Sequence, residues 1–495
     1  MDTAIINNAN VAPAPRARAR PLPRRVEGLR TYRVLTVLVI FGGLIFLVTR
    51  TPPERAVLTP VFLIISIAMV FVGVLFSRDG RLPIFDPGTM FIMATVVYST
   101  VPLIQFWLAG LAFTLYSDFR FWVAQPTAEE LGGFAWRHVT LVATFSVTYL
   151  LCRGSGRNMA PVHPPNALTG VAIAIPLIAT FVFFGALHAY VGPVVSIYAG
   201  GAGEEYQALP YVLQQVTHIL TLVRFTLKQW MLVFLMTQKS FRWRLVAYIW
   251  LAVEVVGTAI SLEARTMGAL LVLTAIVVYH RVVRPLKPMY AFGVAAALLS
   301  GLLVFGVARD FRSTPEERKL MYSMTNEFQG LFANAYDLRQ RKINNRLPPV
   351  PPQLHFSDLY MLVPSQLLPF TKVNPSTWYQ DVVGTRKTGF VFGLLAQSVI
   401  SFDWPDLVVR AALLAMFYAF VHRFYRRRAA SFWNTVLHLF ILSWAYYAYR
   451  STTFDIFYKL IYYFLPTLAM VLLIRLLLTR PVAIARRVVR SQRAP

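Results

Sequence analysis

Long uncharged hydrophobic runs recur along almost the whole chain. A run of about twenty apolar residues is as long as a helix must be to cross a bilayer, so each run predicts a transmembrane helix. By this criterion we expect about twelve spans, at Arg33–Val48, Ala56–Phe76, Gly88–Leu108, Trp136–Leu151, Leu168–Tyr190, Leu213–Gln238, Leu245–Leu262, Met267–Tyr279, Met289–Ala308, Leu407–Phe424, Phe432–Tyr449 and Phe454–Leu477. The pattern therefore predicts an all-α polytopic membrane protein.

Polar stretches divide this pattern into parts. Residues 1–31 form a basic tail rich in Pro and Arg that we expect to be disordered, and residues 32–308 hold the first nine spans. Residues 309–404 form a large helical loop, residues 405–478 hold the last three spans, and residues 479–495 form a second basic tail. The loop is the longest interruption of the membrane pattern, so it is the first place to look for function.

The loop carries helical signals of its own. Thr314, Pro315 and Glu317 have the types and spacing of an N-cap, a first-turn proline and a capping-box acid. Apolar residues then recur at helical spacing, namely Met321, Met324, Phe328, Leu331, Ala335 and Leu338. This predicts an amphipathic helix that ends near Lys342 and either lies in the headgroup region or covers a site as a lid. The apolar stretch Gly389–Ile400 is too short to span and predicts a re-entrant or interfacial segment.

Composition supports the membrane assignment, and charge orients it. Hydrophobic residues make up 57% of the chain and the mean hydropathy is +0.55, which excludes a soluble globule. Lys and Arg concentrate in alternate short loops, and the positive-inside rule places those loops and both termini in the cytoplasm. The loop at residues 309–404 then lies on the periplasmic side, where its length exempts it from the rule. The net charge of +26 is thus largely topological, and we expect no nucleic-acid partner.

Three ionisable residues fall inside predicted spans. Arg224 and Lys228 share one face of a helix, and Glu254 lies at about the same depth as Lys228 in the next span. One interpretation is a structural ion pair between Lys228 and Glu254. The other is a polar face that lines a lateral cavity for a charged lipid headgroup or a substrate, because charges within the membrane are functional candidates.

Arginines also recur at the outer ends of the spans. They are Arg265 in a tight outer turn, Arg309 and Arg312 at the start of the loop, and Arg450 beyond the span that ends at Tyr449. Each one alone is explained by snorkelling to lipid phosphates. Together they indicate a site for an anionic ligand, because guanidinium groups bind phosphate with two parallel hydrogen bonds. The tyrosines near Arg450 suit either an interfacial belt or a sugar ring.

Several catalytic motifs are missing from the sequence. There is no GxxxxGK[ST] loop, HExxH, CxxC pair or nucleophile elbow, so ATP hydrolysis, zinc chemistry and triad chemistry have no support. No DxD-like acidic cluster occurs in the outer loop. We therefore expect no metal and no cofactor, with arginines supplying the charge for any phosphate chemistry.

This arrangement resembles the Wzy-type O-antigen or exopolysaccharide repeat-unit polymerases. The resemblance covers roughly residues 224–477 and rests on a set of loose motifs. These are Glu263-Ala264-Arg265, Arg309, Asn326-Glu327-Phe328, Pro364-Ser-Gln-Leu-Leu-Pro369, Gly389-Phe-Val-Phe-Gly393 and Arg450-Ser-Thr. After the last glycine, Gln397 stands where the family often has an acidic residue.

The resemblance implies a GT-C-like, metal-independent glycosyltransferase at the periplasmic face of the bacterial inner membrane. Its substrate would be a glycan on undecaprenyl pyrophosphate, transferred to a hydroxyl of the next lipid-linked repeat unit, with a chain-length regulator as a further candidate partner. Arg265, Arg309 and Arg450 would bind the pyrophosphates, assisted by Arg312 or Arg386. Glu327, His355 and Asp358 are the candidate general bases, each of which could also be a solvated or capping residue.

Two other functions are consistent with the same features. An O-antigen ligase would use the same donor with a different acceptor. A transporter or flippase for a lipid-linked oligosaccharide would carry the anionic headgroup along Arg224 and Lys228, in a cavity that reaches both sides. A polymerase would instead have a lateral cavity that is open only outward and is covered by the loop.

Overall fold

The described part of the chain is almost entirely helical in the computed structural model. The structure describes residues 24–79, 83, 85–109, 115–116, 123–154, 162–191, 210–261, 265–284, 286, 320–363, 367–384, 392–428, 431–453 and 455–491. The long helices are α1 (Arg24–Val48), α2 (Pro52–Asp79), α3 (Pro87–Ala109), α4 (Ala128–Cys152), α5 (Ala167–Val191), α7 (Tyr211–Thr237), α8 (Phe241–Ser261), α9 (Arg265–Val278), α11 (Leu320–Ile343), α16 (Trp404–Arg427), α17 (Phe432–Ala445) and α19 (Leu465–Ser491).

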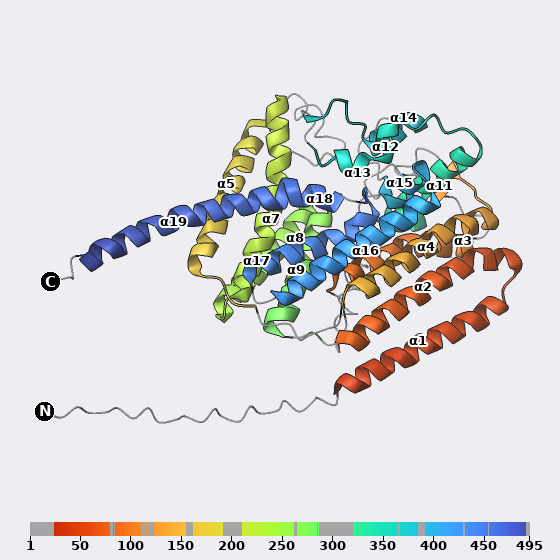
Figure 1. Cartoon of the computed structure of the whole chain (residues 1–495), viewed down its shortest axis with the longest axis horizontal. Helices are drawn as coiled ribbons and strands as arrows, with labels where there is room; N and C mark the ends of the chain where they lie inside the picture. Colours follow the sequence, from red (N-terminus) through yellow and green to blue (C-terminus); the bar gives the residue numbers. More distant parts are fainter. Residues whose placement is uncertain are drawn as a thin grey trace.

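Short elements connect them. They are the two-residue strands β1 (Leu115–Tyr116) and β2 (Val123–Ala124), which pair antiparallel, and η4 (Tyr279–Val283), α12 (Pro352–His355), α13 (Ser357–Tyr360), α14 (Pro375–Val383), α15 (Gly393–Ile400), η7 (Tyr446–Tyr449), α18 (Asp455–Lys459) and η8 (Leu460–Phe464). In Figure 1 the segment with α12, α13 and α14 lies over one end of the helical bundle.

Seven helices in the described part of the chain are long and apolar enough to cross a membrane. They are Gly28–Val48, Pro52–Asp79, Pro87–Ala109, Ala167–Tyr190, Val212–Thr237, Trp404–Arg427 and Asp455–Thr479. The chain is therefore an all-α polytopic membrane protein. The expected spans in α4, α8, α9 and α17 are also helical, whereas Met289–Ala308 lies outside the described residues. The count of twelve spans stays a prediction.

Local sequence explains where two of the central helices begin. The side chain of Thr127 accepts a hydrogen bond from the Glu130 backbone amide, and the Glu130 side chain accepts one from the Thr127 backbone amide, which is a capping box at the start of α4. Asp86 accepts hydrogen bonds from the backbone amides of Gly88 (2.9 Å) and Thr89 (3.4 Å) at the start of α3. Each cap satisfies amides that have no partner within the helix.

Ion pairs join helices α4 and α16 at both ends of the bundle. At one of these ends helix α2 takes part as well. At one end Arg137 of α4 binds Asp403, next to the first residue of α16, with Nε and Nη2 each donating to the carboxylate (2.8 Å at the shortest). At the other end Asp79 of α2 pairs with Arg153, which follows α4, and with Arg426 of α16 (3.1 Å). The last turns of all three helices thus meet, so the helices run in the same direction, as the predicted alternation of loops requires.

A second carboxylate extends the cluster at the Asp79 end. Asp86 binds Arg153 Nε (2.9 Å) and lies 3.3 Å from His422 Nδ1 of α16. Asp86 and Arg153 are almost fully buried, so water is replaced there by mutual hydrogen bonds. These contacts bring several of the predicted basic loops together at one end of the bundle, which we call the basic end.

The helix predicted within the loop is α11, and it is built into the protein. Its end matches the expectation, since it stops at Ile343 and Asn345 then adopts a left-handed backbone with φ of 51°. Residues 328–336 are all buried, with α3 on one side and α15 on another. This packing excludes the alternative in which the helix lies alone in the headgroup region.

The stretch expected to be re-entrant or interfacial forms α15, whose residues are all buried against α11, α16 and η7. Gly393 begins it with φ of +77°, a conformation that strongly favours glycine. A Cβ at this position would lie 2.4 Å from Leu331 Cδ2 of α11. The glycine thus allows α15 to approach α11 closely.

Candidate functional site

A network of buried polar side chains lies at the bundle end opposite the basic end. Its centre is Gln397 of α15, whose Nε2 donates to Ser357 Oγ (2.9 Å) and to Asp358 Oδ2 (2.7 Å). Its Oε1 accepts a hydrogen bond from the Thr453 backbone amide (3.4 Å). All four residues are buried. The Gln397 side chain therefore joins the loop segment and the segment after η7 to α15. It provides hydrogen-bond partners for the buried polar groups around it without adding a charge.

Arg410 of α16 is the cation of this network. It forms ion pairs with Asp358 and with Asp406, and its Nη1 donates to Thr453 Oγ1 (3.2 Å). Sequence reasoning missed this residue because it lies inside an apolar predicted span. The available signal was the spacing Asp406 to Arg410, which is the i to i+4 spacing of a helical ion pair. The pairing gives Asp358 a structural partner, which fits a positioning role better than that of general base.

His355 lies beside this network at the end of α12. Its carbonyl oxygen accepts a weak hydrogen bond from Arg410 Nη2 (3.5 Å), and its ring stacks on Phe402 with 5.6 Å between centroids. The residue is half-buried, and its Nδ1 has no hydrogen-bond partner among the described residues. The main chain is thus held by Arg410, and the Nδ1 atom is enclosed by protein without a hydrogen bond to any described residue.

Two cations contact one tyrosine ring next to the network. The guanidinium carbon of Arg450 lies 5.5 Å from the Tyr447 ring centroid, and Lys459 Nζ lies 4.8 Å from the same centroid. Lys459 also lies 4.7 Å from the centre of the Trp444 ring and pairs with Asp455. Aromatic faces attract cations electrostatically, so these rings hold two positive groups together at the end of α17.

A third cation approaches from α11. Burial and then the like charge of Arg137 lower the pKa of Arg339. Arg339 is half-buried, and its Nε has no hydrogen-bond partner among the described residues. The nearby carboxylates of Asp403 and Glu130 oppose this shift, so Arg339 shares its charged partners with Arg137 at this end of the bundle.

The ion pair expected inside the membrane is present. Lys228 of α7 binds Glu254 of α8, and Glu254 also accepts a hydrogen bond from Trp250 Nε1 (3.1 Å). The predicted ion pair between Lys228 and Glu254 is therefore confirmed. Arg224 lies 4.2 Å above the Phe181 ring of α5, and no described feature tests the cavity interpretation.

Two groups of predicted site residues have no described side chain. Arg309, Arg312 and Arg386 lie outside the described residues. Arg265 begins α9 and Glu327 lies in α11, but their side chains are not among those described. The convergence of the outer arginines thus stays a prediction, and Arg450 is the member whose surroundings are described.

Tyr449 was expected to face a ligand. Its ring is buried and stacks on Tyr98 of α3, with 5.4 Å between centroids and 29° between planes. Protein covers this ring because the short helix that carries it, η7, packs on α3. Tyr447 is the half-buried tyrosine that meets Arg450.

No group of three or more His, Cys, Asp or Glu residues in the described part of the chain has the geometry to hold a metal ion. A comparison with protein-family models, curated proteins and solved structures finds no match to this chain. The chemistry of the site therefore has to be argued from its own residues.

Proposed function

We propose that this protein polymerises lipid-linked oligosaccharide repeat units at the membrane surface, transferring a glycan from a polyprenyl pyrophosphate such as undecaprenyl pyrophosphate. The observation that carries the proposal is the pair Arg450 and Lys459 on the Tyr447 ring, at the same end of the bundle as a half-buried histidine and a buried polar network. A pyrophosphate is an anion anchored at the bilayer surface, and cations at the end of a membrane bundle are in position to meet it.

Two side chains, Arg450 and His355, have separate roles in the proposed reaction. A hydroxyl oxygen of the acceptor sugar attacks the anomeric carbon of the donor, the bond from that carbon to the phosphate oxygen breaks, and the lipid pyrophosphate leaves with the electron pair. Arg450 stabilises the negative charge that grows on the phosphate oxygens. His355 takes the hydroxyl proton as general base, a role that an imidazole performs when the acceptor hydroxyl lies within hydrogen-bond reach of the ring. Arg265, Arg309 and Arg312 are further candidates for binding the pyrophosphate.

The polar network supports this chemistry by fixing its parts. Asp358 and Arg410 tie the backbone at His355 to α16, and Gln397 ties the same segment to Thr453, three residues beyond Arg450. Catalytic groups need to be held within a fraction of an ångström to be effective. The buried network is a scaffold of that kind.

The test uses the purified full chain in lipid nanodiscs with a synthetic undecaprenyl-pyrophosphate repeat unit, and products are sized on a gel with EDTA present. Wild type is expected to give a ladder of products. Arg450→Ala should reduce the rate by on the order of 10²-fold or more, and Arg450→Lys by less, because a lysine keeps the charge but not the paired hydrogen bonds. Arg427→Ala, an exposed position at the basic end, should leave the ladder intact.

The alternatives predict different outcomes in the same assay. A ligase would transfer the glycan once to a lipid A core acceptor and would give no ladder. A flippase would give no ladder in nanodiscs, and in sealed vesicles it would move the labelled lipid across the bilayer without lengthening it.

A further inference from the structure

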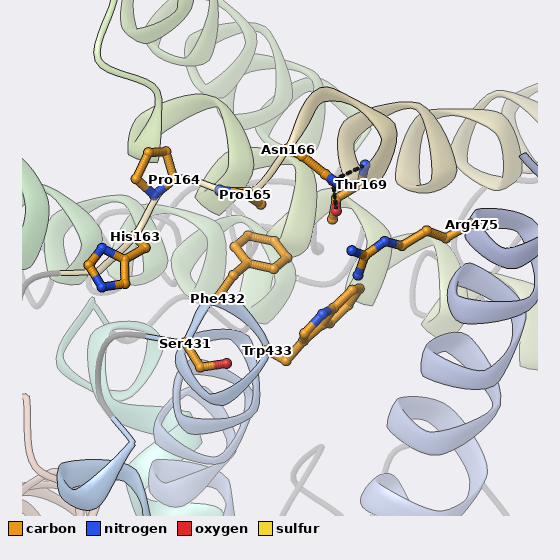
Figure 2. A pocket seen from close by; sticks show the side chains of 9 residues that line it. All are labelled: His163, Pro164, Pro165, Asn166, Thr169, Ser431, Phe432, Trp433 and Arg475. Atoms are coloured by element: carbon orange, nitrogen blue, oxygen red, sulfur yellow. Dashed lines mark hydrogen bonds between the residues drawn. The ribbon is translucent and has the colours of Figure 1, made fainter. Parts of the chain in front are cut away.

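A cavity of about 480 Å³ opens at the basic end of the bundle, away from the proposed catalytic site. It is lined by His163, Pro164, Pro165, Asn166 and Thr169 around the start of α5, by Ser431, Phe432 and Trp433 at the start of α17, and by Arg475 of α19. Figure 2 shows the Arg475 side chain reaching from α19 toward the space between Trp433 and Thr169. This volume is in the range of ordinary small-molecule sites.

Arg475 is the unusual member of this lining. It lies within the apolar span Asp455–Thr479, about one turn before its end, and is half-buried. It forms no hydrogen bond, ion pair or ring contact with any residue that the structure describes. An unpaired charge within a membrane span raises the free energy of the folded protein. We therefore expect an anion from outside the chain to bind Arg475.

The rest of the lining favours an anion with apolar parts. No Asp or Glu lines the cavity among the residues that the structure describes, so no carboxylate there repels a negative group. The rings of Phe432 and Trp433 and the two prolines offer apolar walls. On α19, the neighbours Leu472, Leu473, Leu476 and Leu477 are exposed on the outside of the bundle, where acyl chains would lie along them.

We infer that this cavity is a binding site for the headgroup of an anionic membrane phospholipid. Arg475 binds the phosphate through its guanidinium fork, and the acyl chains run along the exposed leucines of α19. The positive ends of the α5 and α17 dipoles face the same space and add to the attraction. Simple snorkelling of Arg475 would need no cavity, whereas a seated headgroup needs both the cavity and the charge. The site is independent of the proposed polymerase activity.

The experiment is native mass spectrometry of the delipidated full chain titrated with phosphatidylglycerol, with phosphatidylcholine as the zwitterionic comparison. Wild type is expected to bind phosphatidylglycerol in preference to phosphatidylcholine. Arg475→Gln should weaken that binding by about tenfold, the effect of losing roughly one charge-assisted interaction. The matched control Arg427→Gln, an exposed arginine at the same end, should leave it unchanged.

A second variant tests the cavity without removing the charge. Ser431 lines the space and its side chain makes no capping hydrogen bond, so Ser431→Phe fills volume and should also weaken phosphatidylglycerol binding. Equal binding by wild type, Arg475→Gln and Ser431→Phe would overturn the proposal. So would a wild type that binds undecaprenyl phosphate strongly and the two phospholipids equally, because the occupant would then not be a membrane phospholipid.

Discussion

Arg410, inside helix α16, is ion-paired with Asp358, which lies 52 residues earlier in the segment before α15. Both side chains are buried. A buried charge depends on its partner, because removing one member leaves the other without water or a counter-ion. This pair therefore holds the segment that contains α12 and α13 against helix α16 of the membrane bundle.

Replacing Asp358 by alanine is expected to lower the free energy of unfolding by about 3 kcal/mol, since Arg410 would keep only Asp406 as a carboxylate partner. The measurement is the thermal unfolding midpoint of the purified protein in detergent. Glu129→Ala, at an exposed acid in the first turn of α4, is the control and should change the midpoint little. Equal midpoints for Asp358→Ala and wild type would show that the pair does not hold the two segments together.

The contact between α15 and α11 depends on Gly393. Gly393→Ala should destabilise the protein by about 1–3 kcal/mol, because the residue has a positive φ and its new Cβ would meet Leu331. Gly257→Ala in α8 is a matched control, since open space surrounds that position. There the same substitution should be neutral or slightly stabilising. Unfolding in detergent measures both, and similar midpoints for the two variants would contradict the close approach of α15 to α11.

The pair Lys228 and Glu254 permits a double-mutant cycle. Lys228→Met should cost about 3 kcal/mol of stability by leaving Glu254 uncompensated, and adding Glu254→Gln should recover most of the loss. The amide oxygen introduced by Glu254→Gln would still be able to accept the hydrogen bond from Trp250. Stability is read from unfolding and function from the polymerisation assay. If the double variant is stable yet inactive, the charges have a role beyond pairing.

His355 is expected to affect rate more than stability. His355→Gln should slow polymerisation by on the order of 10²-fold through loss of the general base. Folding should be preserved, because the hydrogen bond from Arg410 goes to the His355 carbonyl, which the substitution keeps. His188→Gln, an exposed histidine of α5, controls for the change of residue type. A wild-type rate for His355→Gln would assign the proton transfer to another group, with Glu327 as the next candidate.

Part of the candidate site was accessible from sequence. Lys228 and Glu254 were expected to meet because they are equally far along the chain from the turn that joins their two antiparallel helices. Each residue therefore lies at the same depth in the membrane, and this depth follows from the local sequence alone. Arg450 was identified from its place just beyond a predicted span, and His355 was identified as a candidate general base in the outer loop. Arg410 was missed because it lies inside an apolar predicted span, and its local spacing from Asp406 gives no sign of its distant partners Asp358 and Thr453. No local pattern encodes such a meeting.

The sequence by itself determined that this is a helical membrane protein, because the length and hydrophobicity of a span follow directly from the thickness and polarity of a bilayer. It also determined where α11 ends and that α15 is too short to span. Only the tertiary structure decided that α11 and α15 are buried together, that Gln397 and Arg410 join three distant segments, and that Arg475 faces a cavity. Those relationships depend on which helix faces pack against each other, and packing is a property of shape across the whole chain.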